Sequence, residues 1–255
     1  MGKLVGKTSL ITGAASGFGK GMALRFAEEG SDIIMFDLDS EGMNETSRQI
    51  QEINSECRIF TSTIDVSDFE SVSQGVNTLL SQDLEINILV NNAGWSHPNQ
   101  PLLDVDQNTL RKVYAINVFS IFNLTHAIVP HWRQLGGGVM LNISSTAGSR
   151  PRPGLTWYNS TKGAVNTLTK SLGVELAPDN IRVCGIAPVI GNTALTETFM
   201  GVPNTPENRE RFLQTIPLGR YCEATDVAEA ALYLVSEQAN FITGVILEVD
   251  GGRCI

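Results

Sequence analysis

Residues 9–19, SLITGAASGFG, connect a short apolar segment to a run with helical periodicity over 17–29. The three glycines of this turn let the backbone bend sharply and approach a bound group without a Cβ in the way. The helix that follows offers free N–H groups and the positive end of its dipole at the same place. This order of elements predicts a site for the pyrophosphate of a dinucleotide. The expected contacts are Gly13, Ser16, Gly17, Phe18 and Gly19.

Short apolar runs and longer amphipathic stretches alternate along the rest of the chain. The runs lack strict polar–apolar alternation, which suits strands buried on both faces of a parallel sheet. The expected strands are 9–11, 32–36, 58–64, 87–90, 138–143, 181–186 and 245–249. The expected helices are 17–29, 40–54, 67–80, 106–133, 157–176 and 224–236. This order predicts an α/β fold: a single domain, 1–255, with a doubly wound (Rossmann) parallel sheet of about seven strands flanked by helices.

One long irregular stretch, 188–217, interrupts the alternation late in the chain. It carries Pro203, Pro206 and several Gly, Asn and Thr residues. A connection of that length inside a compact domain is usually a lid or a binding loop. We therefore expect it to cover the substrate.

The composition narrows the possible partners. The formal net charge of -9 over 255 residues argues against binding a nucleic acid or an anionic membrane surface. No apolar run reaches the ~18 residues of a membrane span. The four cysteines have no CxxC pair and no metal-ligand spacing, so reduced thiols are expected. We expect a cytoplasmic protein with a small-molecule partner, no metal and no membrane contact.

Asp37 ends the second expected strand. A carboxylate there can accept hydrogen bonds from the ribose hydroxyls of NAD and would repel the 2′-phosphate of NADP. No Arg or Lys occurs in 14–18 or in 37–40 to bind that phosphate. A solvated strand-end Asp is the alternative. The sequence therefore predicts NAD as the cofactor.

Tyr158 and Lys162 are four residues apart in an expected helix, so they share one of its faces. A surface pair is the alternative explanation for that spacing alone. Three polar groups elsewhere favour a catalytic site: Asn142-Ile143-Ser144-Ser145 at a strand end, Asn91-Asn92-Ala93-Gly94 after the fourth strand, and Asn117 within 106–133.

These residues resemble the motifs of the short-chain dehydrogenase/reductase family, NAD-linked type, over essentially the whole chain. The matching elements are Thr12-Gly13-x3-Gly17-x-Gly19, Asp65-Val66, Asn91-Asn92-Ala93-Gly94, Asn117, Ser145, Tyr158-x3-Lys162 and Asp250-Gly251-Gly252. The resemblance implies hydride transfer between a nicotinamide cofactor and the carbon of a carbonyl or secondary alcohol.

The resemblance also implies catalytic roles. Tyr158 would be the general acid/base, and Ser145 would hydrogen-bond the substrate oxygen, with Ser144 disfavoured by the family's spacing. Lys162 would hold the nicotinamide ribose, and Asn117 would fix a water that links Lys162 to solvent. A cation about 4 Å away, at an effective dielectric of about 20, is worth about 4 kcal/mol or roughly three pKa units. We therefore expect Lys162, helped by the nicotinamide, to bring the pKa of Tyr158 near neutrality.

Further cofactor contacts follow from the resemblance. Asp65 and Val66 are expected at the adenine, and Asn91 and Gly94 on the adenosine side of the cleft, although 91–94 can also simply shape a turn. Where the family commonly has Asn-Pro-Gly, this chain has Ala187-Pro188-Val189. The expected contacts of the nicotinamide end are Pro188, Ile190, Thr193, Tyr158 and Lys162.

The expected substrate pocket is largely apolar and is walled by 95–97, 147–157 and 189–200. His97 is expected to be a partly exposed loop residue, with a role in polarising the substrate as the alternative. Arg150 and Arg152 would either grip an anionic substrate or brace a subunit interface, and the interface is favoured.

The expected helices 106–133 and 157–176 are rich in apolar residues. In the family that the chain resembles, the equivalent helices form a contact between subunits. Residues 245–255 are consistent with a second contact between subunits. We therefore expect a homotetramer.

The leading function is an NAD-dependent alcohol or polyol dehydrogenase. One alternative is a 3-oxoacyl-[acyl-carrier-protein] reductase, which Asp37 and the acidic balance disfavour. Another is a non-catalytic NAD-sensing protein, which intact Ser145, Tyr158 and Lys162 disfavour.

Overall fold

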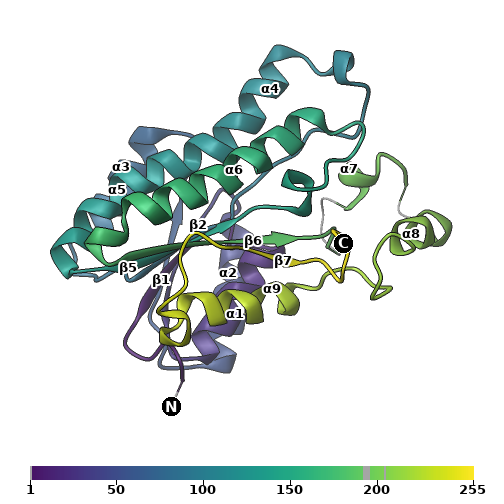
Figure 1. The fold of residues 1–255 in the computed structure, drawn as a ribbon. Coiled ribbons are helices and arrows are strands. Elements are labelled where there is room, and N and C mark those ends of the chain that lie inside the picture. Colours follow the sequence, from purple (N-terminus) through teal and green to yellow (C-terminus); the bar gives the residue numbers. More distant parts are fainter. Residues whose placement is uncertain (1, 192–195, 204) are drawn as a thin grey trace.

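The computed structural model describes residues 2–191, 196–203 and 205–255. Seven parallel strands form one sheet in the order β3-β2-β1-β4-β5-β6-β7 (Figure 1). The strands are β1 (Thr8–Thr12), β2 (Asp32–Asp37), β3 (Ile59–Thr63), β4 (Ile88–Asn91), β5 (Gly138–Ile143), β6 (Ile181–Pro188) and β7 (Ile246–Val249). The sequence predicted these seven strands within a few residues at each end, so the predicted doubly wound sheet is confirmed.

Helices cover both faces of the sheet (Figure 1). One face carries α1 (Gly17–Glu28), α2 (Ser40–Ile53) and α9 (Ala224–Val235). The other carries α3 (Phe69–Leu80), α4 (Gln107–Tyr114), α5 (Ser120–Leu135) and α6 (Thr156–Glu175). Two buried apolar clusters, one on each side of the strands, make up most of the core.

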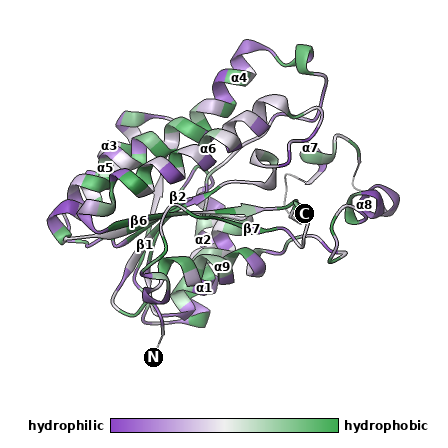
Figure 2. Cartoon of the chain, in the orientation of Figure 1, coloured by the Kyte–Doolittle hydropathy of each residue, from purple (hydrophilic) through white to green (hydrophobic). Residues whose placement is uncertain are grey.

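Burial explains why the strands lack polar–apolar alternation. Every residue of β1 and β4 is buried, because helices lie on both sides of them,. Strands β3 and β7 at the sheet edges are partly exposed. Figure 2 shows the central strands mostly in the hydrophobic colour.

The predicted helix 106–133 is continuous but not uniform. Between α4 and α5 the chain makes a π-helical turn, η2 (Ala115–Phe119). Such turns are rare, and they often occur at functional sites because the widened turn displaces a side chain from the α-helical register. Asn117 lies in the middle of this one.

The stretch 188–217 is less irregular than predicted. It contains two short helices, α7 (Thr196–Met200) and α8 (Pro206–Leu213). Thr205 is the N-cap of α8, and its side chain accepts a hydrogen bond from the N–H of Asn208,. Pro206 is the first residue of the helix, a position that suits proline,. Figure 2 shows α8 mostly in the hydrophilic colour. A lid function for this stretch stays a prediction.

Short one-turn helices complete the connections. They are η1 (Leu102–Asp104), η3 (Thr146–Gly148), η4 (Ala177–Asp179) and η5 (Glu237–Ala239). η3 matters for function, because it begins directly after Ser145 at the end of β5 and turns the chain toward α6.

The segment Gln107–Leu135 has the length and apolar composition to cross a membrane, with a mean hydropathy of 1.4 in its most apolar window. This corrects the expectation that no segment qualifies. Its apolar face, including Leu124, Ile128 and Trp132, is buried against the sheet. The Nε1 of Trp132 donates a 2.7 Å hydrogen bond to the carbonyl of Ile86. This packing is that of a core helix.

Candidate active site

A cavity of about 650 Å³ opens at the carboxyl ends of the strands. β1 and β4 are neighbours in the sheet, but the chain leaves β1 toward α1 on one face and β4 toward α4 and α5 on the other. In doubly wound sheets, ligands bind where the connections diverge in this way. The fold therefore puts the cavity at the expected place.

The glycine turn forms one wall of this cavity. Gly13 and Gly17 have φ angles of 65° and 55°, which favour glycine,. A Cβ on Gly13 would lie 2.9 Å from Nδ2 of Asn92, and one on Gly19 would lie 2.0 Å from the carbonyl oxygen of Gly13. Gly13, Ser16, Gly17 and Phe18 line the cavity, whereas Gly19 is absent from its lining and supports the turn by close packing.

The start of α1 is available to a ligand. Ser16 precedes the helix in an extended conformation and makes no side-chain cap hydrogen bond. The first-turn N–H groups of a helix lack partners within it, so they can bind an anion. The close glycine packing and these donors together fit the pyrophosphate of a dinucleotide.

Asp37 lies at the end of β2 with its carboxylate held from two sides. Oδ2 accepts a 2.9 Å hydrogen bond from the N–H of Ala15, and Oδ1 accepts one of 3.1 Å from the N–H of Asp39. Asp37 lines the cavity together with the exposed Leu38. This is the position from which a carboxylate reaches a ribose.

Asp65 and Val66, after β3, line the same end of the cavity. The Oδ1 of Asp65 accepts hydrogen bonds from the N–H and the hydroxyl of Ser67, at 2.9 and 2.6 Å. The carbonyl of Val66 accepts one of 2.9 Å from Asn123. Both residues are therefore fixed where the resemblance expects the adenine.

One residue of the Asn91–Gly94 segment lies elsewhere than expected. Asn91 does not line the cavity; its Nδ2 donates a 2.8 Å hydrogen bond to Asn142 on the neighbouring strand. Asn92 lines it instead, and its Nδ2 donates to the carbonyls of Thr12 and Gly13. Gly94 lines the cavity, and a Cβ on it would lie 3.7 Å from Nζ of Lys162, so it lies near that lysine; its contact with the cofactor stays a prediction.

The predicted catalytic side chains meet at the centre of the cavity. Ser145 follows β5, and α6 brings Tyr158 and Lys162 beside it; all three line the cavity. The Nζ of Lys162 lies 5.8 Å from the centre of the Tyr158 ring. The hydroxyl of Ser145 lies near enough to Tyr158 to lower its pKa, and the Oγ of Ser145 accepts a 3.1 Å bond from the N–H of Ala147.

The structure separates the two adjacent serines. The hydroxyl of Ser144 is buried and donates to Oδ1 of Asn166 at 2.5 Å, with the carbonyl of Lys162 at 3.2 Å. The hydroxyl of Ser145 is the one that acts on Tyr158, because it lowers the pKa of the phenol. The choice of Ser145 over Ser144 therefore agrees with the geometry.

The protonation of Tyr158 and Lys162 differs from the expectation. Burial raises the pKa of Tyr158 to about 12, although the hydrogen bond from Ser145 and the charge of Arg152 lower it. Burial lowers the pKa of Lys162 to about 8. In the chain without cofactor, desolvation outweighs the nearby charges; the expectation that Lys162, helped by the nicotinamide, brings Tyr158 near neutrality stays a prediction.

Asn117 does not line the cavity, and its side chain holds the loop after β4. Its Oδ1 accepts a 2.8 Å hydrogen bond from the N–H of Trp95, and its Nδ2 donates to the carbonyl of Trp95 and to Thr161. The amide is thus fully engaged. A contact of Asn117 with a relay water would have to come from its backbone in the π-helical turn.

The end of β6 forms the wall opposite the glycine turn. Pro188, Val189, Ile190 and Gly191 line the cavity. The carbonyl of Ile190 accepts a 3.2 Å hydrogen bond from the N–H of Cys222. The backbone N–H of Ile190 is therefore our candidate donor to the carboxamide of the nicotinamide. A Cβ on Gly191 would lie 2.6 Å from the Phe18 ring. Thr193 lies outside the described residues.

Arg150 and Arg152 have different surroundings. The Arg150 guanidinium donates to the carbonyl of Arg253, outside the cavity. Arg152 lines the cavity, where the alternative of gripping an anionic substrate is open to it, whereas Arg150 does not line it.

His97 is fully buried, not partly exposed as predicted. Its Nδ1 donates a 2.7 Å hydrogen bond to the carbonyl of Pro98, and its Nε2 has no partner among the described residues. It does not line the cavity.

Several lining residues were not predicted as site residues. Leu38 directly follows Asp37, so its position after the strand was a usable signal. Ile116 lies in the π-helical turn and Gly191 beyond β6; nothing in their local sequence distinguishes them.

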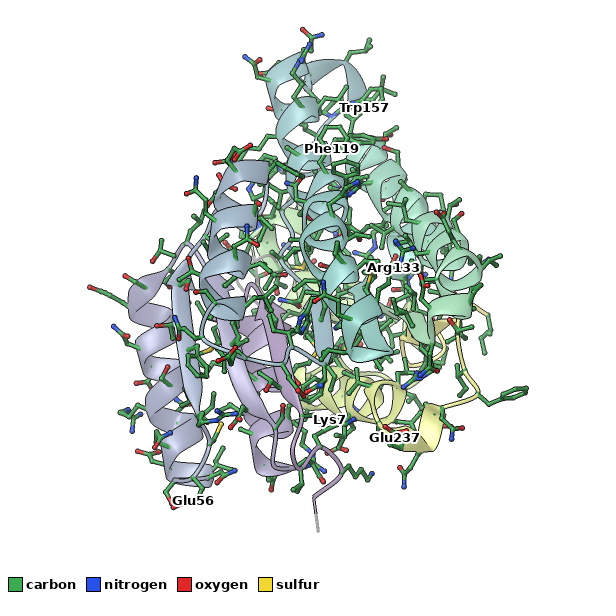
Figure 3. All side chains as sticks on the ribbon, turned by 90° about the vertical axis from the view of Figure 1, so that its left-hand side faces the viewer. Lys7, Glu56, Phe119, Arg133, Trp157 and Glu237 are labelled. Carbon is green, nitrogen blue, oxygen red and sulfur yellow. The ribbon has the colours of Figure 1, made fainter. Side chains whose placement is uncertain are left out.

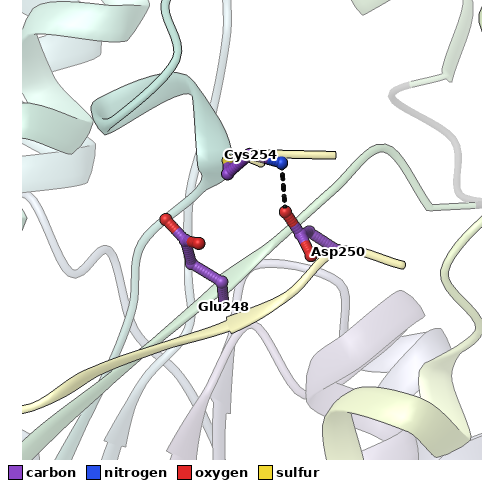
Figure 4. Close-up of side chains that lie close together, drawn as sticks. All are labelled: Glu248, Asp250 and Cys254. Atoms are coloured by element: carbon purple, nitrogen blue, oxygen red, sulfur yellow. Dashed lines mark hydrogen bonds between the residues drawn. The ribbon is translucent and has the colours of Figure 1, made fainter. Parts of the chain in front are cut away.

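A separate polar cluster lies near the C-terminus. Glu248, Asp250 and Cys254 bring one ligand atom each within 4.8 Å of one another (Figure 4). Asp250 accepts hydrogen bonds from the N–H groups of Gly252 and Cys254, which closes the turn. Burial and the carboxylates raise the pKa of the Cys254 thiol to about 12, which keeps it protonated. We assign a structural role to this cluster.

Comparisons with known proteins agree with this geometry. A family model described as Enoyl-(Acyl carrier protein) reductase matches residues 13–253. The chain is 41% identical over 249 residues to 4-formylbenzenesulfonate dehydrogenase of Comamonas testosteroni, covering 98% of each protein. It is 35% identical to 7alpha-hydroxysteroid dehydrogenase of Escherichia coli, covering 98% of this chain and 95% of the relative.

A solved structure supports the same assignment. The 3-ketoacyl-(acyl-carrier-protein) reductase of Brucella melitensis, complexed with NADH, superposes with a TM-score of 0.91 at 41% identity, covering 99% of this chain and 100% of that one. The chain belongs to the short-chain dehydrogenase/reductase family. It is an oxidoreductase that uses a nicotinamide nucleotide.

Proposed function

We propose that this protein is an NAD-preferring dehydrogenase that interconverts a secondary alcohol and a ketone. The observation that carries the proposal is the meeting of Ser145, Tyr158 and Lys162 in one cavity, with the glycine turn along its wall. The nicotinamide ring, when bound, supplies the hydride acceptor or donor.

The residues divide the remaining work. In alcohol oxidation, Tyr158 accepts the hydroxyl proton at its phenolic oxygen, and in ketone reduction it donates the proton to the carbonyl oxygen. Ser145, which lines the cavity beside Tyr158, holds the same substrate oxygen in line. Lys162 holds the ribose and favours the phenolate. Asn117 fixes the loop at Trp95 and, through its backbone, positions a relay water.

The cofactor preference rests on charge. Asp37 is preoriented at the ribose end by two backbone N–H groups. Among the described residues that line the cavity, the basic side chains are Arg152 and Lys162. Both lie near Tyr158, where neither would meet a 2′-phosphate. NAD therefore fits better than NADP.

The test is NADH formation with a panel of secondary alcohols, polyols, hydroxy acids and steroids, run beside Tyr158→Phe. We expect turnover with at least one class and a loss of about 10²- to 10⁴-fold in the variant, with NADH binding retained. NAD binding without turnover by the wild type on any panel compound would contradict the enzymatic proposal and favour a sensing role.

A second candidate is a 3-oxoacyl-[acyl-carrier-protein] reductase. It is favoured by the likeness to the Brucella melitensis structure. The net charge of -9 opposes docking of an acidic carrier. Reduction of an acetoacetyl carrier-protein thioester at a higher kcat/KM than any small ketone would replace the leading proposal.

We also propose a homotetramer in the cytoplasm. Exposed apolar side chains occur on the layer of α5 and α6, including Phe119, Phe122 and Val174, and near the C-terminus at Phe241 and Ile255. Phe119 is labelled in Figure 3. Exposed apolar patches of this kind mark contact surfaces. Light scattering that gives a stable monomer would contradict the tetramer.

A further inference from the structure

Arg152 places a positive charge in the catalytic cavity. It lines the space shared by Ser145 and Tyr158, and it forms no ion pair with any residue that the structure describes. Six other arginines do have carboxylate partners: Arg25, Arg48, Arg58, Arg133, Arg211 and Arg220.

The surroundings of Arg152 disfavour its charge. Burial lowers the pKa of its guanidinium to about 10, and the positive charge of Arg253 acts in the same direction. The groups that act in the opposite direction are the phenols of Tyr158 and Tyr221, which are neutral at pH 7,. A charge that is largely buried needs a counter-charge. An anion in the cavity would provide it.

The guanidinium is also held in place. Pro151 and Pro153 flank the residue, and its carbonyl accepts a 2.8 Å hydrogen bond from Nδ2 of Asn159. Its Cζ lies 5.1 Å from the centre of the Phe212 ring on α8. A guanidinium presents its N–H donors as a rigid planar fork that matches a carboxylate or sulfonate.

Apolar side chains line the same cavity as this cation and the reacting groups. Leu155, Phe199 and Trp95 line the cavity, and the rings of Tyr158 and Phe199 are 5.1 Å apart. The loops that carry them are tied by Asn99. Its N–H donates to the carbonyl of Thr198, and its Nδ2 donates to the carbonyl of Pro153, both at 3.0 Å.

We infer that Arg152 binds a carboxylate or sulfonate carried by the substrate. The site would then take small carbonyl or hydroxy compounds with an apolar body and one anionic group, oriented so that the oxygen reaches Ser145 and Tyr158. This inference rests on the proposed oxidoreductase function, which it deepens. The pyrophosphate is not the anion meant here, because the glycine turn already accounts for it.

The test is binding, so it does not depend on turnover. Calorimetry on the protein–NADH complex compares toluene-4-sulfonate with its neutral analogue methyl 4-tolyl sulfone. We expect the wild type to bind the sulfonate at least tenfold more tightly, and Arg152→Gln to abolish that difference. Arg152→Lys should keep part of it, since the charge remains but the fork is lost. Arg150→Gln is the matched control and should keep it in full.

Equal binding of the two compounds by the wild type, or an equal loss in the Arg150 and Arg152 variants, overturns the inference. A melting temperature for each variant separates these outcomes from misfolding, with Arg152→Lys as the milder change. Turnover of 4-acetylbenzoate against acetophenone forms the second arm. If neither ketone reacts while the sulfonate still binds through Arg152, the proposed reaction fails and the anion site stands.

Discussion

The ammonium of Lys162 donates a 2.9 Å hydrogen bond to the carbonyl oxygen of Ile143 at the end of β5. Lys162 is buried and has no carboxylate partner among the described residues. Burial lowers its pKa from 10.5 to about 8, so at pH 7 the folded protein carries a charge that the unfolded chain solvates better. The position is suited to holding a ribose and polarising a phenol, and it costs stability.

We therefore expect Lys162→Met to be inactive and more stable. The pKa of Lys162 is lower by about 2.5 units in the folded protein than in the unfolded chain. At pH 7 this difference lowers the free energy of unfolding by about 3 kcal/mol,. Loss of the bond to Ile143 offsets about 1 kcal/mol, so the free energy of unfolding should rise by about 2 kcal/mol. Denaturant unfolding measures it.

The sign of the pH dependence checks the cause. Below about pH 8 both states bind the proton, so the destabilisation by Lys162 is at its full value. Between about pH 8 and 10.5 the folded state loses its proton first, and the destabilisation declines,. The increase in the free energy of unfolding caused by Lys162→Met should therefore be markedly smaller at pH 9.5 than at pH 7. Lys170→Met, at an exposed position of the same helix, is the control and should not raise the free energy of unfolding in this way. An increase in Lys162→Met that does not change with pH would refute the charge explanation.

The two serines after β5 should respond differently to substitution. Ser145→Ala should lower kcat by about 10²-fold or more, because it removes a donor to the substrate oxygen, and should shift the pH profile to higher pH, because Ser145 lowers the pKa of Tyr158. Ser144→Ala breaks buried bonds to Asn166 and Lys162 and should cost about 1–2 kcal/mol of stability. Steady-state kinetics and thermal melts on both variants test this, and a larger kcat loss at Ser144 would reverse the assignment.

The fold was predictable because each strand is a short apolar run next to a turn. The helical periodicity of 106–133 continues through 115–119, so the π-helical turn around Asn117 could not be predicted from the residue pattern. α8 was missed although Thr205 and Pro206 form a recognisable helix start. Eight residues with little apolar periodicity did not stand out from a loop.

In the site, motif positions were easier to predict than side-chain environments. Arg150 and Arg152 look alike in sequence, yet only Arg152 lines the cavity. The burial of His97 depends on loops that pack against it from distant parts of the chain. The burial that raises the pKa of Tyr158 was not predictable, because the sequence shows nearby charges but not how much water is excluded.

Alcohol oxidation should increase with pH. Burial raises the pKa of Tyr158 to about 12, so the phenolate that accepts the proton becomes about tenfold more abundant per pH unit below that value. Bound nicotinamide will lower the pKa somewhat by its charge. We expect kcat/KM for oxidation to rise at least about tenfold from pH 7 to 9, while ketone reduction, which needs the protonated phenol, does not rise. Oxidation rates that stay flat over this range would contradict Tyr158 as the base.

Asp37→Asn should shift the cofactor preference toward NADP. The amide can still accept the hydrogen bond from Ala15, so the variant removes the charge while keeping the turn. Loss of repulsion toward the 2′-phosphate should raise kcat/KM for NADP, and loss of a carboxylate acceptor should lower it for NAD. We expect their ratio to change at least about tenfold, or about 1.4 kcal/mol. Asp39→Asn is the matched control, because Asp39 caps α2 without lining the cavity. An unchanged ratio in Asp37→Asn, or a wild type that already prefers NADP, would show that another group selects the cofactor.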